Sequence, residues 1–111
     1  MRTKMKAELR RAQLVDTALQ MARQDGFSAI KRDQLAEAAG MSYGVIHWVF
    51  PGAGMAAVKS ATIEAVIELL TAQPDDKPLL TVLAQALGEG NEAARTAPDK
   101  MKKAALATLM S

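Results

Sequence analysis

Apolar residues recur at the three- and four-residue spacing of an amphipathic helix along most of this 111-residue chain. In the segment 55–72, for example, Ile63, Val66 and Leu70 fall on one helix face, and Lys59 is expected to point into solvent. The same pattern predicts six helices, over residues 8–24, 31–39, 43–50, 55–72 and 78–87, with a last one that begins at residue 91 or residue 96. Strand formers are scarce, since only 4% of the residues are aromatic, so we expect an all-α fold.

The second and third of these helices have the features of a helix-turn-helix unit. Gly40 supplies the positive-φ position that ends the first of them. Ser42 can cap the next by accepting a hydrogen bond from a free backbone N–H, and Ile46 and Phe50 then share its buried face. In such a unit the second helix fits the major groove of DNA.

At these residues the chain resembles the DNA-binding domain of the tetracycline-repressor (TetR) family of transcriptional regulators. The positions that carry the resemblance lie within residues 9–58, and they are Leu14, Val15, Ala18, Met21, Gly26, Phe27, the run 35–40, Ser42, Gly44, Ile46, Phe50 and Pro51. The resemblance implies a helix-turn-helix DNA-binding domain over residues 1–52 and a short helical dimerisation region over residues 53–111. Because only about 57 residues follow the glycine-rich joint at 51–54, too few for the family's usual ligand-binding domain, we expect no small-molecule inducer.

Mapping the family pattern onto this sequence gives nine expected DNA-binding residues. They are Arg10, Arg11, Lys31, Arg32, Ser42, Tyr43, Gly44, His47 and Trp48. Lys31 and Arg32 are expected to meet phosphates, and Arg10 and Arg11 to reach an adjacent phosphate or the minor groove. Residues 42–44 are expected to begin the recognition helix, where base edges are reached. His47 stands where the family usually has a phosphate-contacting tyrosine, and Trp48 could pack on sugar or on a thymine methyl group.

The sequence departs from the family pattern in ways that bear on binding. Ile30 replaces a threonine that usually caps the second helix, so Ser28 or solvent must satisfy those N–H groups. The recognition helix contains no Lys or Arg, which removes the commonest guanine contact. The plainer interpretation makes Tyr43 and Trp48 partly buried aromatics, His47 a solvent-facing residue, and the cations of the second helix merely solvated charges.

Charge is distributed unevenly along the chain. Residues 1–32 hold eight basic and three acidic side chains, a net charge of +5, whereas residues 53–111 hold six basic and seven acidic ones, a net charge of −1. We expect residues 1–7 to form a loose basic arm. A basic end joined to a nearly neutral one suits a polyanion-binding module, although cations that only solubilise a helix end would give the same count.

Other functional classes have little support in the sequence. There is no cysteine and only one histidine, so we expect neither catalysis nor a metal site, and no cofactor. Residues 38–58 carry no charge, but five glycines and prolines interrupt them, so we expect no membrane span. No apolar signal-peptide core follows the basic start, and we expect a soluble, cytoplasmic protein.

Together these features predict a sequence-specific regulator that binds double-stranded DNA, a homodimeric repressor on an inverted-repeat operator. The fifth and last helices are expected to pair with those of a second copy, because their apolar surface exceeds what one small helical layer can cover. Three alternatives stay open. They are a self-contained six-helix monomer, a helical protein-interaction module or anti-repressor that has lost DNA readout, and a small-molecule sensor.

Overall fold

The computed structural model describes residues 2–51 and 54–110, and throughout this part of the chain the regular structure is helical. The elements are α1 (Arg2–Asp25), the 3-10 turn η1 (Phe27–Ala29), α2 (Arg32–Ala39), α3 (Tyr43–Val49), α4 (Met55–Ala72), α5 (Lys77–Gly88), α6 (Glu92–Arg95) and α7 (Asp99–Met110). The predicted all-α class is confirmed. The expected domain boundary falls on Gly52 and Ala53, which lie outside the described residues.

Helix α1 begins earlier than the hydrophobic pattern indicates. It starts at Arg2 rather than at Glu8, so the predicted loose arm is wrong for residues 2–7, and Met1 lies outside the described residues. The physical reason is local. This stretch contains no glycine or proline, and five of its six residues are Arg, Lys, Met or Ala, which favour helix, so the helix propagates backward from its apolar part.

The C-terminal segment contains both of the alternative helices. Helix α6 begins after Asn91, whose side-chain oxygen accepts the Ala94 N–H at 3.1 Å, and α7 begins separately at Asp99. Thr96 and Asp99 have the spacing of a capping box, which predicts that Thr96 caps the last helix. The Thr96 hydroxyl instead donates to the Ala93 carbonyl at 2.7 Å. Within residues 54–110, four helices therefore follow the helix-turn-helix unit in place of the expected three.

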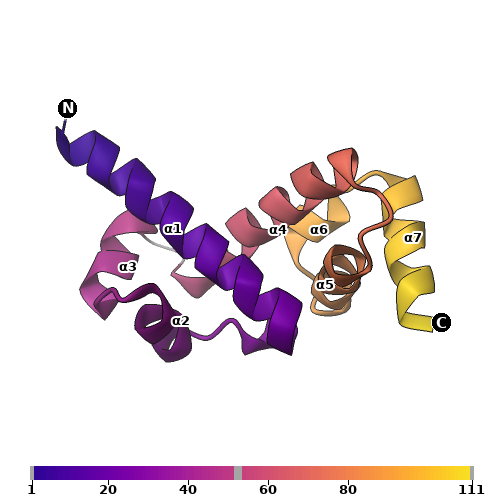
Figure 1. The fold of residues 1–111 in the computed structure, drawn as a ribbon, viewed down its shortest axis with the longest axis horizontal. Coiled ribbons are helices and arrows are strands. Elements are labelled where there is room, and N and C mark those ends of the chain that lie inside the picture. The colour runs from indigo at the N-terminus through magenta and orange to yellow at the C-terminus, as the bar shows by residue number, and fades with distance from the viewer. Residues whose placement is uncertain (1, 52–53, 111) are drawn as a thin grey trace.

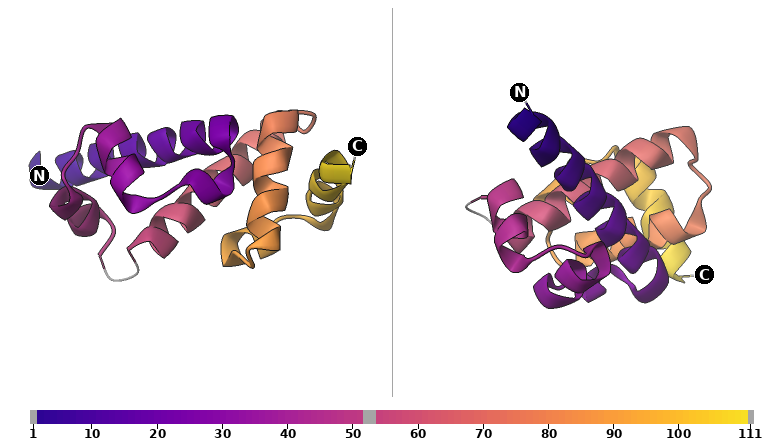
Figure 2. Two further views of the ribbon diagram at one scale, coloured as in Figure 1. Left: turned by 90° about the horizontal axis from the view of Figure 1, so that it is seen from below. Right: turned by 60° about the vertical axis from the view of Figure 1, so that its left-hand side comes forward.

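The helices form an elongated molecule of 43 × 27 × 21 Å. Helix α3 and the N-terminus of α1 lie at one end, and α7 lies at the other (Figure 1). Helix α1 runs from this end to the middle of the molecule and packs against α2, α3, α4 and α5, while α7 packs on α5 (Figure 2). The end that carries α3 and the end that carries α7 are thus held apart by α1, α4 and α5.

Helix α5 lies in the interior of the C-terminal half. Its buried residues are Leu79, Leu80, Val82, Leu83, Ala84 and Ala86. They point to several sides of the helix, where α1, α4 and α7 cover them. The buried apolar residues of α5 are therefore covered within one chain, and the pairing of this helix with a second copy stays a prediction.

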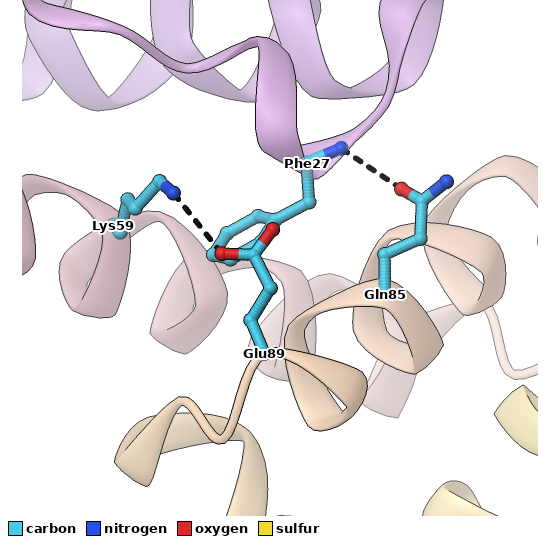
Figure 3. A network of polar contacts seen from close by, with 4 residues as sticks. All are labelled: Phe27, Lys59, Gln85 and Glu89. Atoms are coloured by element: carbon cyan, nitrogen blue, oxygen red, sulfur yellow. Dashed lines mark hydrogen bonds and ion pairs between the residues drawn. The ribbon is translucent and has the colours of Figure 1, made fainter.

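A group of four residues joins the turn after α1 to the C-terminal helices (Figure 3). The Phe27 side chain is fully buried, and its backbone N–H donates to Gln85 Oε1 of α5 at 2.8 Å. Lys59 Nζ of α4 lies 5.0 Å from the centre of the Phe27 ring and donates to Glu89 Oε1 at 3.1 Å. Lys59 is thus partly buried at this junction, contrary to the predicted solvent-facing position. The preceding Gly26 has φ 99°, which other residues rarely adopt.

We expect the Gln85→Leu variant to lower the free energy of unfolding by about 1–3 kcal/mol, because it leaves the Phe27 N–H without its acceptor. Urea denaturation followed by circular dichroism measures this. Gln24→Leu is the matched control, since Gln24 is exposed near the end of α1 and its replacement should cost little. Equal stability of the two variants would contradict a structural role for this hydrogen bond.

Candidate nucleic-acid interface

The α2–α3 turn has the local geometry that the sequence predicts. Gly40 adopts a left-handed conformation, φ 65° and ψ 33°, and ends α2. Ser42 precedes α3 in an extended conformation, and its hydroxyl oxygen accepts the Val45 N–H at 3.4 Å. Both predictions are confirmed, so the orientation of α3 after α2 follows from one glycine and one capping serine.

Helix α3 presents two different sides. Ile46 and Phe50 are 2% and 4% exposed and face the core of α1 and α2. On the other side Tyr43 and Trp48 are 42% and 50% exposed, and Gly44 and His47 are exposed as well. The two aromatic side chains therefore keep about half their surface available to a ligand. The solvent side of α3 is aromatic and polar and carries no acidic residue.

An arginine stacks on an aromatic ring at each end of α3. The guanidinium carbon of Arg32, the first residue of α2, lies 4.1 Å from the centre of the Tyr43 ring. That of Arg11 on α1 lies 4.9 Å from the centre of the Phe50 ring. Cation–π contact restrains each side chain, yet both residues stay exposed. Two pre-positioned cations thus bracket a helix that is about 10 Å long.

A small pocket joins three of the predicted site residues. It has a volume of about 250 Å³ and is lined by Arg32, Tyr43, Ile46, His47, Gly54 and Met55. Gly54 and Met55, at the start of α4, were not predicted, because nothing in the local pattern indicates that α4 begins beside α3. At this volume the pocket is smaller than the usual site for a drug-sized ligand.

The remaining predicted residues surround this arrangement. Helix α2 begins at Arg32, one residue later than predicted. Lys31 is its exposed N-cap, and the Lys31 side chain forms no capping bond. Ser28 does not cap α2 either, and Ile30 is a buried core residue instead. Arg10 is half-buried beside Arg11 on α1. Exposed cations therefore stand near the starts of both helices of the unit, although α2 also exposes acidic residues.

We expect two glycines of this unit to respond oppositely to substitution. Gly40→Ala should lower the free energy of unfolding by about 1–2 kcal/mol, because alanine is strained in the left-handed region. Gly44→Ala should raise it by up to about 1 kcal/mol, since Gly44 is helical and an added Cβ would meet only the Ser42 hydroxyl at 4.0 Å. Thermal melts measure both changes. Shifts of the melting temperature in the same direction would contradict the conformations of Gly40 and Gly44.

The part of the chain that the structure describes brings no three His, Asp or Glu residues into a metal-binding arrangement. Among the same residues, none of the helices has the length and apolarity needed to cross a bilayer. Comparisons of this chain with models of known protein families, with curated proteins and with solved structures give no match. What α3 and its flanking cations bind must therefore be inferred from their own chemistry.

Proposed function

We propose that this protein is a TetR-like transcriptional regulator that binds double-stranded DNA through α3 and represses by occluding polymerase at a promoter. The observation that carries the proposal is the solvent side of α3, which exposes Tyr43, His47 and Trp48 between the stacked side chains of Arg32 and Arg11. An exposed helix without acidic residues, flanked by fixed cations, suits a polyanion with a groove of matching width.

The dimensions suit docking in the major groove of B-DNA. An α-helix with its side chains is about 10–12 Å in diameter, and the groove is about 12 Å wide. With α3 in the groove, its first turn, with Tyr43 and Gly44, meets base edges, and Arg32 and Arg11 meet phosphates on either side. Planar guanidinium groups bind phosphate oxygens in pairs, which fixes the orientation of the helix.

Base recognition in this complex uses side chains other than Lys and Arg. With no Lys or Arg on α3, sequence is read by the Tyr43 hydroxyl, the His47 ring and apolar contact from Trp48, which suits a thymine methyl group. Such contacts are few, so one copy binds weakly. Two copies on half-sites about 34–36 Å apart would add their contacts, which favours an inverted-repeat operator.

A second candidate function is a helical protein-interaction module, such as an anti-repressor that pairs with another regulator. The exposed aromatic pair Tyr43 and Trp48 favours it, because aromatic residues are enriched where proteins meet. The absence of a cation on α3 favours it too. The stacked arginines favour DNA instead, since nothing in a neutral partner requires two restrained cations at the ends of α3.

Fluorescence anisotropy tests the proposed function. The purified protein is titrated against the DNA upstream of its own gene and against a scrambled duplex of the same composition, each at two salt concentrations. We expect tighter binding to the natural duplex, with an affinity that falls steeply as salt rises, because phosphate contacts release counterions. No binding to either duplex at low salt would overturn the proposal and favour the interaction module.

Arg32→Ala and Arg11→Ala separate phosphate contact from base reading. Each should weaken binding to all sequences alike and reduce the slope of log K against log salt by about one. Lys77→Ala is the control, because it removes the same charge from an exposed position on α5. If Lys77→Ala reduced the slope as much as the arginine variants, the effect would come from net charge alone.

Gly44→Ala distinguishes a functional glycine from a structural one. We expect this variant to fold at least as stably as the natural protein and yet to bind the operator at least tenfold more weakly, because the added methyl group keeps α3 from approaching the groove. Anisotropy and thermal melts on the same sample measure both quantities. Undiminished operator affinity would show that the backbone at Gly44 does not approach DNA.

A further inference from the structure

His47 shares a pocket with a cation. The pocket, of about 250 Å³, lies between α3 and the start of α4, and Arg32 of α2 lines it together with Tyr43 and His47. The His47 side chain is exposed, and it is the only histidine of the chain. Among the described residues, those that line this pocket include no carboxylate. An anion can therefore approach His47 without meeting a negative charge.

We propose that DNA binding by this protein is linked to protonation, and that His47 takes up the proton when the duplex binds. The inference rests on the proposed function and deepens it, because it concerns regulation of the same surface. The group that meets His47 is a hydrogen-bond acceptor of DNA, either a phosphate oxygen or the acceptor edge of guanine. A fall in pH across the neutral range tightens the complex, and a rise loosens it.

The hydrogen-bonding capacity of an imidazole ring changes with its charge. The neutral ring has one donor nitrogen and one acceptor nitrogen, whereas the imidazolium has two donors and a positive charge. Phosphate oxygens are acceptors, and so are O6 and N7 of guanine in the major groove. Imidazole rings ordinarily change charge near pH 6.5, so both forms exist at neutral pH. DNA therefore favours the charged form over the neutral one.

The pocket supplies nothing that balances a positive charge on His47. Arg32 is itself a cation, and a phenol such as that of Tyr43 is uncharged at neutral pH. The first turn of α4, which begins at the pocket, contains no acidic residue and carries partial positive charge. A bound duplex changes this, because its phosphates bring negative charge to the ring. The complex should therefore hold one more proton than the separate molecules do.

Other charged residues on the neighbouring helices do not supply that negative charge. Besides Arg32, the described charged residues on the first half of α1 and on α2 with its N-cap are Glu8, Arg10, Arg11, Lys31, Asp33 and Glu37. None of these six lines the pocket, and Arg11 is held at the Phe50 ring beyond the other end of α3. The first charged residue of α4, Lys59, is already paired with Glu89. The counter-charge for His47 must therefore come from the ligand.

The direction of the pH effect follows from the number of protons in each state. Where the complex holds more protons than the free molecules, affinity rises as the pH falls. The gain is complete once the free ring is protonated as well, and it disappears when the pH is high enough for the bound ring to lose its proton. Replacing a neutral hydrogen bond by a charge-assisted one corresponds to about fivefold or more in affinity.

Anisotropy titrations from about pH 5.5 to about pH 8, at constant ionic strength, test the proposal on the natural and the scrambled duplex. The natural chain should bind about fivefold or more tightly at the low end of this range. His47→Gln, which does not titrate, should lose this dependence. His47→Arg, charged throughout, should also be insensitive to pH, with a salt slope steeper by about one than that of His47→Gln. Circular dichroism at each pH verifies that every variant folds.

The double variant His47→Gln with Gln24→His is the matched control. It returns one histidine to the chain at an exposed position near the end of α1, and it should stay insensitive to pH. The two duplexes identify the acceptor in the natural complex. An equal gain on both duplexes at low pH indicates a phosphate, and a gain on the natural duplex alone indicates a base.

Three outcomes would overturn the proton linkage and leave the proposed function in place. They are an affinity that does not change across the pH range, a pH dependence that His47→Gln retains, and one that Gln24→His restores. Absence of binding to either duplex at every pH and at low salt is a different result. It would overturn the proposed function, and the linkage with it.

Discussion

The arrangement of the helices depends on the hydrogen bond between the Phe27 N–H and Gln85 Oε1. Phe27 is fully buried on the turn after α1, and Gln85 belongs to the interior helix α5, 58 positions further along the chain. Lys59 covers the Phe27 ring from α4 and pairs with Glu89 at the end of α5. These contacts join α1, α4 and α5 to one another (Figure 3). The joined helices hold α3 and α7 at opposite ends of the molecule (Figure 1).

The same support explains why α3 can expose so much aromatic surface. Ile46 and Phe50 anchor the helix in the core, so its stability does not require Tyr43 or Trp48 to be buried. Stacking of Arg32 on Tyr43 restrains the exposed side chain and lowers the entropy lost when a ligand binds. A core that holds only one side of a seven-residue helix leaves the other side free for recognition, which is the physical basis for proposing α3 as the binding element.

Local patterns in the sequence predict most of this fold, and contacts between distant segments account for the rest. The bounds of α4, the left-handed Gly40 and the Ser42 cap are confirmed, because periodicity, glycine conformation and capping act within a few residues. The stacking of Arg11 on Phe50 is not readable from the sequence, since no local rule brings residue 11 beside residue 50. For α5, the apolar pattern shows that the helix must be covered but not whether its own chain or a second copy covers it.

The recognition side of α3 offers only weak contacts to DNA in the proposed complex. Helix α3 has no Lys or Arg for a bidentate guanine contact. In the proposed complex, two copies add their weak contacts when both recognition helices occupy half-sites at the right distance. The rigid junction at Phe27 makes that distance a property of the fold rather than of a flexible linker. Discrimination between DNA sites would then come as much from half-site spacing as from the identity of individual bases.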